Sequence, residues 1–293
     1  MKTLLTFLIL SVFSSTFYAQ QYVDLVNIQH SHQLKNAKGV LPGQSDHTAS
    51  SIDLLLPLVL NEKVVILTGV TLEQTTLSRD QDVCSTIYGT SLKLGANIKH
   101  SESFIATYLL LPKISSNFKN TNSDHFQIGG VFLGKYIFSP DFNVRFGVYA
   151  NREFFGPFIV PFAGFYLKRG NWELKAAVPI NAEVSRSFLQ ERMALGLRFD
   201  GIRRSYFLGD SDSYIEKANN EVGLFGQYKL GNTVFRLTMG HSLGRSLRRF
   251  DAGDKADLAL PLAKINNNRM ETASISPNGI YTRITLIYRL PTS

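Results

Sequence analysis

The sequence predicts an all-β fold: an antiparallel, up-and-down transmembrane β-barrel of about 14 strands, with 12 also possible. Three observations lead to this prediction. Apolar and polar residues alternate with a period of two in many segments, short turns follow every second segment, and the remaining connections are longer and polar. Alternation of this kind gives a strand one apolar and one polar face. Turns sorted by length to the two ends are typical of a membrane barrel.

The alternation is clearest between residues 126 and 180. In Phe142–Asn151 the even positions are apolar, whereas the odd positions include Asn143, Arg145 and Asn151. The following arm, Trp172–Ile180, places Glu173 and Lys175 on one face and apolar residues on the other. Each segment therefore fits a strand between an apolar and a polar environment.

Fourteen segments fit this pattern: 22–30, 51–60, 63–75, 86–98, 102–111, 125–138, 142–151, 156–167, 171–180, 192–199, 202–208, 221–229, 232–242 and 278–290. Short turns are expected at 61–62, 99–101, 139–141, 168–170, 200–201 and 230–231. Asp200–Gly201 is the strongest of them, since this dipeptide suits the positive φ of a type I′ hairpin. Longer connections are expected at 74–85, 113–124, 209–220 and 243–277.

The two faces of these strands predict a lipid-facing exterior and a polar lumen. Charged residues at alternate strand positions need water or partners, and a lumen supplies both. The residues expected to line the lumen are Arg145, Glu173, Lys175, Arg198, Glu221, Lys229, Arg236, Arg283 and Arg289. Aromatic residues near strand ends are expected to form interfacial girdles: Tyr136, Phe138, Phe142, Tyr166, Trp172 and Tyr288. Pro57 and Pro161 fall inside strands, where a closed barrel predicts a bulge at each.

The first residues predict export. Met1–Ala19 combines Lys2, a short apolar run and a small-residue exit, which is the pattern of a signal peptide. The expected organisation is a signal peptide at residues 1–19 and an outer-membrane barrel at 20–293. Cys84 is the only cysteine, so no internal disulfide is expected. The net charge of +8 comes from scattered basic residues without a nucleic-acid-binding motif, and we expect no nucleic-acid partner.

With these residues in view, the chain from about residue 22 to 290 resembles the outer-membrane β-barrel proteins of Gram-negative bacteria. More narrowly, Asn171-Trp172-Glu173-Leu174 with Val178-Pro179, after Gly156-Pro157 and Pro161, resembles a family of exported barrels of unestablished function. The resemblance implies a location in the outer membrane, with lipid and the membrane's insertion machinery as partners. It implies no catalytic residue.

One motif suggests enzyme chemistry. Gly240-His241-Ser242-Leu243-Gly244 fits G-x-S-x-G, which in α/β-hydrolases exposes a nucleophilic serine between a strand and a helix. No helix is expected after it, and His241 would point to the opposite strand face from Ser242. We expect a strand end entering a loop, no catalytic residue, no metal site and no cofactor.

Three functions remain open from the sequence. The first is a pore or transporter for small solutes, with lumen cations favouring anions. The second is a closed structural barrel, or one that binds a partner through its loops, without transport. The third is a membrane-embedded hydrolase that uses Ser242.

Overall fold

The computed structural model of the chain describes residues 22–33, 46–79, 83–120, 123–275 and 278–291. The predicted signal peptide lies outside the described residues. The described residues form seventeen strands and one short 3-10 helix, η1 (Ser123–His125). The strands are β1 (Tyr22–Gln33), β2 (Asp46–Val59), β3 (Val64–Arg79), β4 (Val83–Lys99), β5 (Phe104–Ser116), β6 (Phe126–Ser139), β7 (Phe142–Glu153), β8 (Gly156–Arg169), β9 (Trp172–Ala177), β10 (Asn181–Phe188), β11 (Met193–Leu208), β12 (Ser213–Leu230), β13 (Thr233–Asp251), β14 (Leu258–Ala259), β15 (Lys264–Ile265), β16 (Glu271–Ile275) and β17 (Ile280–Pro291).

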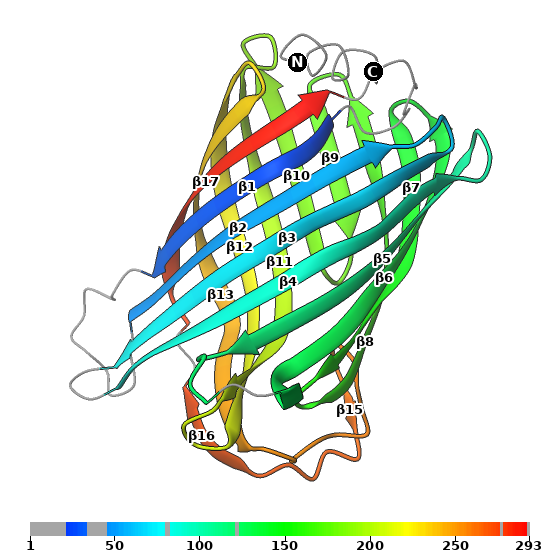
Figure 1. The fold of residues 1–293 in the computed structure, drawn as a ribbon. Helices are drawn as coiled ribbons and strands as arrows, with labels where there is room; N and C mark the ends of the chain where they lie inside the picture. The colour runs from blue at the N-terminus through cyan, green and yellow to red at the C-terminus, as the bar shows by residue number, and fades with distance from the viewer. Residues whose placement is uncertain (1–21, 34–45, 80–82, 121–122, 276–277, 292–293) are drawn as a thin grey trace, which may run out of the picture.

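Fourteen of these strands close into a barrel (Figure 1). Each of β1 to β13 pairs antiparallel with its neighbour in sequence, β13 pairs with β17, and β17 returns to β1. The closing pairs run from Tyr22↔Pro291 to Gln33↔Tyr281, with one bulge after Asp24. The three short strands β14, β15 and β16 belong to the connection between β13 and β17. The predicted antiparallel up-and-down barrel of 14 strands is confirmed.

The exterior of the barrel is apolar. Leu224, Leu237 and Ile284 lie on the adjacent strands β12, β13 and β17 and are 65%, 59% and 65% exposed. Leucines and aromatic residues on the other strands continue this surface, among them Leu56, Leu94, Leu110, Phe126 and Phe138. A contiguous apolar surface of this size marks contact with a membrane or a partner. In the described part of the chain, no helix is long and apolar enough to cross a membrane.

One end of the barrel carries the hairpin turns, and we call it the turn side. Tyr22 and Pro291 also lie there, at the upper end in Figure 1. In the β2–β3 turn the side-chain oxygen of Asn61 accepts hydrogen bonds from the amides of Lys63 and Val64, both at 2.9 Å. Gly170 and Gly231 adopt φ of +57° in their turns, a conformation that favours glycine. Five of the six predicted turns are confirmed at this end.

The sixth predicted turn, at Asp200–Gly201, is wrong. Both residues lie inside the continuous strand β11, and neither has a positive φ. Asp200 instead forms an ion pair with Arg198, two residues earlier on the same face, at 2.6 Å. The hairpin turn comes earlier, at Leu189–Glu191, where three consecutive non-glycine residues have φ between 50° and 64°. The predicted count of 14 therefore combined one strand divided in two with one strand, β10, that was missed.

The opposite end, the loop side, differs from the prediction in two ways. The strands extend into the predicted loops: β12 begins at Ser213, β13 continues to Asp251, and β16 pairs with β13. Two connections there are also short, because only residues 154–155 join β7 to β8 and only 178–180 join β9 to β10. Most of the predicted loop at 209–220 and about half of that at 243–277 are therefore strand.

The expected bulges at the two prolines are also wrong. Pro57 pairs with Leu67 and Pro161 with Val148 in ladders without a register shift. Each proline lies where its strand lacks a partner on the other side, since β1–β2 pairing ends at Leu54 and β8 has no regular neighbour beyond Ala163. A missing amide donor is tolerated at such an edge.

Candidate functional site

The lumen contains a chamber of about 950 Å³. Its wall mixes ion-paired, cationic and apolar side chains from both halves of the barrel. Lys93 pairs with Asp53 at 2.5 Å on one side, and Arg145 and Phe162 face the chamber on the other. A cavity of this size and mixed character has room for a small organic solute.

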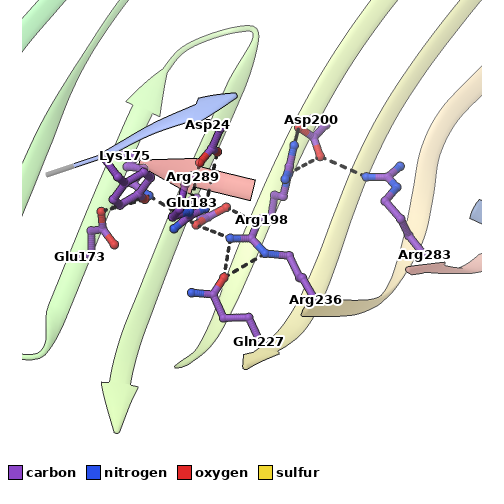
Figure 2. Close-up of polar contacts among 11 residues, drawn as sticks. Asp24, Glu173, Lys175, Glu183, Arg198, Asp200, Gln227, Arg236, Arg283 and Arg289 are labelled. Atoms are coloured by element: carbon purple, nitrogen blue, oxygen red, sulfur yellow. Dashed lines mark hydrogen bonds and ion pairs between the residues drawn. The ribbon is translucent and has the colours of Figure 1, made fainter. Parts of the chain in front are cut away.

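An ion-pair network lies on the turn side of the chamber (Figure 2). Arg236 on β13 donates two hydrogen bonds to Glu183 on β10, at 2.7 and 3.2 Å, and another to Gln227 on β12 at 2.7 Å. Asp200 pairs with Arg198 and, at 3.4 Å, with Arg283 on β17. Alternation places all these side chains on the inner face of β10 to β17.

The network reaches across the lumen at Tyr22. This residue lies on β1, which is separated from β9 by at least six strand steps around the barrel. The Tyr22 hydroxyl nevertheless donates a hydrogen bond to Glu173 on β9 at 3.3 Å and accepts one from Lys175. Arg289 stacks on the Tyr22 ring, with its guanidinium carbon 3.9 Å from the ring centroid. We call Tyr22, Glu173 and Lys175 the turn-side crossing.

Glu221 is the most buried carboxylate of the turn-side half. It is 3% exposed and pairs with Arg245 at 2.6 Å and with Arg283. Asn219 donates a further hydrogen bond to it at 2.7 Å. Arg245, itself 2% exposed, also donates to Asn219 and to Gln33 on β1. Buried charges need such complete pairing, because an isolated one is costly in a medium of low dielectric constant.

A second crossing lies on the loop side of the chamber. Glu73 on β3 accepts hydrogen bonds from Tyr206, at 2.6 Å, and from Arg204, both on β11. β3 and β11 are also at least six strand steps apart, so these contacts traverse the lumen. We call Glu73, Arg204 and Tyr206 the loop-side crossing.

The loop-side half of β11 leaves the barrel wall to reach this position. Phe207 forms a parallel bridge with Ser116 at the end of β5. Ser205 donates from its hydroxyl to Glu153 on β7 at 2.6 Å, and Glu153 pairs with Lys113 at 2.7 Å. β11 therefore passes from the wall into the barrel mouth.

The connection after β13 is held down by one carboxylate. Glu216 forms ion pairs with Lys264 at 2.7 Å and with Arg269 at 2.8 Å. Burial lowers the pKa of the Lys264 amine to about 8, against the opposing effect of its hydrogen bond to Glu216. Lys264 is therefore charged below that pH, and its ion pair with Glu216 fixes the connection to β12.

Eight of the nine residues expected in the lumen belong to the turn-side network, the turn-side crossing or the chamber wall. Seven of them belong to the turn-side network or crossing: Glu173, Lys175, Arg198, Glu221, Arg236, Arg283 and Arg289. Arg145 lines the chamber, where it donates to Asn143 at 2.9 Å and lies 5.8 Å from the Tyr166 ring. Lys229 is exposed beside the β12–β13 turn and lies outside the network. Tyr166, expected in an aromatic girdle, is 1% exposed and faces the lumen.

Three partners of these residues were not predicted from the sequence. Tyr22, Glu73 and Arg245 complete the crossings and the network. Arg245 lies in a predicted connection, and Glu73 lies near a predicted strand end. Strand β10, which carries Glu183, was also missed, and polar alternation across 181–188, where Glu183, Ser185 and Ser187 face one side, was the available signal.

Ser242 has no access to a substrate. It is fully buried on β13, where its hydroxyl donates to the Gly279 carbonyl at 3.2 Å and accepts from the Gly279 amide at 3.0 Å. The strand continues past the motif to Asp251, so the expected strand end is wrong and no nucleophile elbow forms. Among the residues that the structure describes, no three His, Cys, Asp or Glu side chains are grouped to hold a metal ion.

Several solved membrane-protein structures are similar in overall shape. They include an outer membrane channel from Pseudomonas putida F1, with 11% identity, coverage of 94% of this chain and 98% of that one, and a TM-score of 0.41. The CymD monoaromatic hydrocarbon channel has 12% identity, coverage of 91% and 89%, and a TM-score of 0.37. A TodX monoaromatic hydrocarbon channel mutant has 8% identity, coverage of 93% and 90%, and a TM-score of 0.37. A search of curated proteins finds no match.

The sequence itself matches one family model. The matched residues are 15–256 of the 293, which include every barrel strand except β17. The predicted resemblance around Trp172 lies within this match. The chain belongs to the family described as Domain of unknown function (DUF6268).

Proposed function

We propose that this chain is an outer-membrane barrel that conducts small solutes and prefers anions. The observation that carries the proposal is the chamber of about 950 Å³ inside a closed barrel with an apolar exterior. A barrel filled by its own side chains would leave no such space. The apolar exterior supports insertion in a membrane, since lipid-facing strand positions are apolar in barrels of this type.

The charge of the chamber supports the preference for anions. Lys135 on β6 and Arg145 on β7 are directly opposite each other in the ladder, and both face the lumen. An anion beside these two cations would be attracted to both, and pores use rings of charged side chains in this way to select ions.

The two crossings favour one alternative, a barrel that does not transport. Side chains from opposite walls meet on both sides of the chamber, at Tyr22 and at Glu73. In the transport proposal the crossings narrow the axial path, and in the alternative they close it. Electrical conductance separates the two.

The test is single-channel recording in planar bilayers with the wild type, Tyr22→Ala and Tyr288→Ala. Tyr288 is the matched control, a tyrosine on the exterior of β17 that is 41% exposed. We expect a small current from the wild type, at least twofold larger with Tyr22→Ala and unchanged with Tyr288→Ala. No current from either the wild type or the Tyr22→Ala variant would favour the closed barrel.

A further inference from the structure

The barrel wall is interrupted between β8 and β11. The hairpin between them, β9–β10, is short, with strands of six and eight residues. β9 pairs with β8 only at residues 166–169, followed by a single bridge between Ala163 and Val178. β10 pairs with β11 only as far as Asp200. β8 continues to Gly156 and β11 to Leu208, so a window remains between the hairpin tip at Val178–Ile180 and the point where β14 pairs with β8 at Phe158.

The window has a defined frame. Its turn-side rim is the hairpin tip, where the Gly201 amide donates to the Ile180 carbonyl at 2.8 Å. Its loop-side rim is the contact between β11 and the β7–β8 connection, where the Phe154 amide donates to the Ser205 hydroxyl at 2.8 Å. The eight residues of the tilted strand β10 rise about 20 Å along the barrel axis from the turn side. The turn-side rim therefore lies within an apolar band about 25 Å tall, near its loop-side edge.

The sequence of β8 is adapted to this open edge. The Ala163 amide donates toward β9, to Val178, so amides at 161, 159 and 157 point to the same side of the strand. Two of these three positions are Pro161 and Pro157, which have no amide hydrogen. Proline is confined to such edges within sheets. An open edge would leave backbone amide donors without a partner at these positions. At positions 157 and 161 proline removes that donor.

The window connects to the chamber along a lining that is mainly apolar. Its apolar residues that line the chamber are Phe158, Val160, Phe162, Pro179, Ile180 and Ile202, and Arg203 and Arg204 also line the chamber beside Ile202. Ile202 lies on an inward-facing position of β11 and is still 40% exposed. On the exterior, β8 shows apolar residues beside the window, including Ile159 and Ala163. The path from the lipid side is therefore mainly apolar, whereas both axial ends are spanned by the polar crossings.

The connection after β13 borders the window. It reaches β8 through a parallel bridge between Ala259 and Phe158, and its Pro261 and Leu262 line the same chamber. Leu262 is 99% exposed, so nothing in the barrel packs over its side chain.

We propose that this window is a lateral portal through which amphipathic anions pass between the membrane and the chamber. The apolar lining takes the apolar body of the solute, and two cations of the lumen wall, Arg145 at the chamber and Lys135 opposite it on β6, take its anionic group. This inference rests on the proposed function for its transport step, and the window itself can be tested separately.

The window is tested first, without transport. In a Cys84→Ser background, Ile202→Cys at the window is compared with Leu133→Cys, a second inward position of the chamber wall, on β6. Reconstituted protein is labelled with a maleimide confined to the lipid phase. We expect Ile202→Cys to react at least tenfold faster than Leu133→Cys. Equal rates would overturn the portal whether or not the protein conducts.

Transport is tested with two permanent anions, naphthalene-2-sulfonate and methanesulfonate, released from proteoliposomes. Ile202→Trp narrows the window, and Leu224→Trp, on the exterior of β12, is the control. We expect Ile202→Trp to lower naphthalene-2-sulfonate release at least fivefold and methanesulfonate release less than twofold, and Leu224→Trp to change neither. A parallel fall of both anions, or of neither, would overturn the portal. Fast lipid-phase labelling of Ile202→Cys without release of either anion from the wild type would instead overturn the proposed function.

Discussion

Replacing Glu221 by glutamine tests whether the turn-side network stabilises the barrel. Glu221 is 3% exposed and serves two guanidinium groups, those of Arg245 and Arg283. Glutamine keeps the size of the side chain and removes its charge. Arg283 retains Asp200 at 3.4 Å, but Arg245 is 2% exposed and loses its carboxylate partner.

The expected loss of stability follows from the burial of Arg245. Breaking a buried ion pair by removing one partner costs about 3 to 5 kcal/mol, because the remaining charge is left uncompensated. The folded-to-unfolded ratio should therefore fall by about 100- to 4,000-fold, at about 1.4 kcal/mol for each factor of ten. The matched control is Glu191→Gln, since Glu191 pairs with Lys168 at 2.9 Å while its side chain is 54% exposed. An exposed pair of this kind contributes at most about 1 kcal/mol.

The assay is reversible denaturant unfolding in lipid vesicles, followed by the fluorescence of Trp172. This is the only tryptophan of the chain, and its side chain is 48% exposed on the barrel exterior. If Glu221→Gln lowers the free energy of unfolding no more than Glu191→Gln does, the reasoning is refuted. Water in the lumen would then stabilise the charge of Arg245 as well as the Glu221 carboxylate does.

Three further predictions follow from single contacts. Glu216→Gln removes the anchor of Lys264, so trypsin should cut the connection after β13 at least tenfold faster than in the wild type; equal digestion would contradict the anchoring role. Replacing Lys135 and Arg145 together by glutamate should shift the reversal potential in a KCl gradient from anion toward cation preference, and an unchanged potential would remove the pair from the permeation path. Ser242→Ala should leave ester hydrolysis unchanged from a mock preparation and lower stability by about 1 to 2 kcal/mol through the lost hydrogen bonds to the backbone; a loss of esterase activity would revive the hydrolase hypothesis.

Strand periodicity determined the fold class, because inner and outer positions of a barrel face different solvents. The segment Phe142–Asn151 shows this directly: its even positions face outward, and Asn143 and Arg145 face the lumen. Glycines in turns, such as Gly170 and Gly231, were equally visible, since positive φ favours that residue. The turn at Leu189–Glu191 was not visible, because three non-glycine residues adopt positive φ there only under the constraint of the paired strands.

The alternation of the sequence predicted the barrel, its inner face and most of the charges on that face. Which of these charges meet depends on closure of the sheet, because partners such as Tyr22 and Lys175 are 153 residues apart and come together only in the closed barrel. The window in the wall is likewise visible only in the pairing of the strands. Pro161 was expected to need a bulge in a closed sheet, and the pairing of β8 places it on an edge beyond the last bridge to the β9–β10 hairpin. Local alternation records which solvent a residue faces, whereas contact across the lumen depends on the register and closure of the whole sheet.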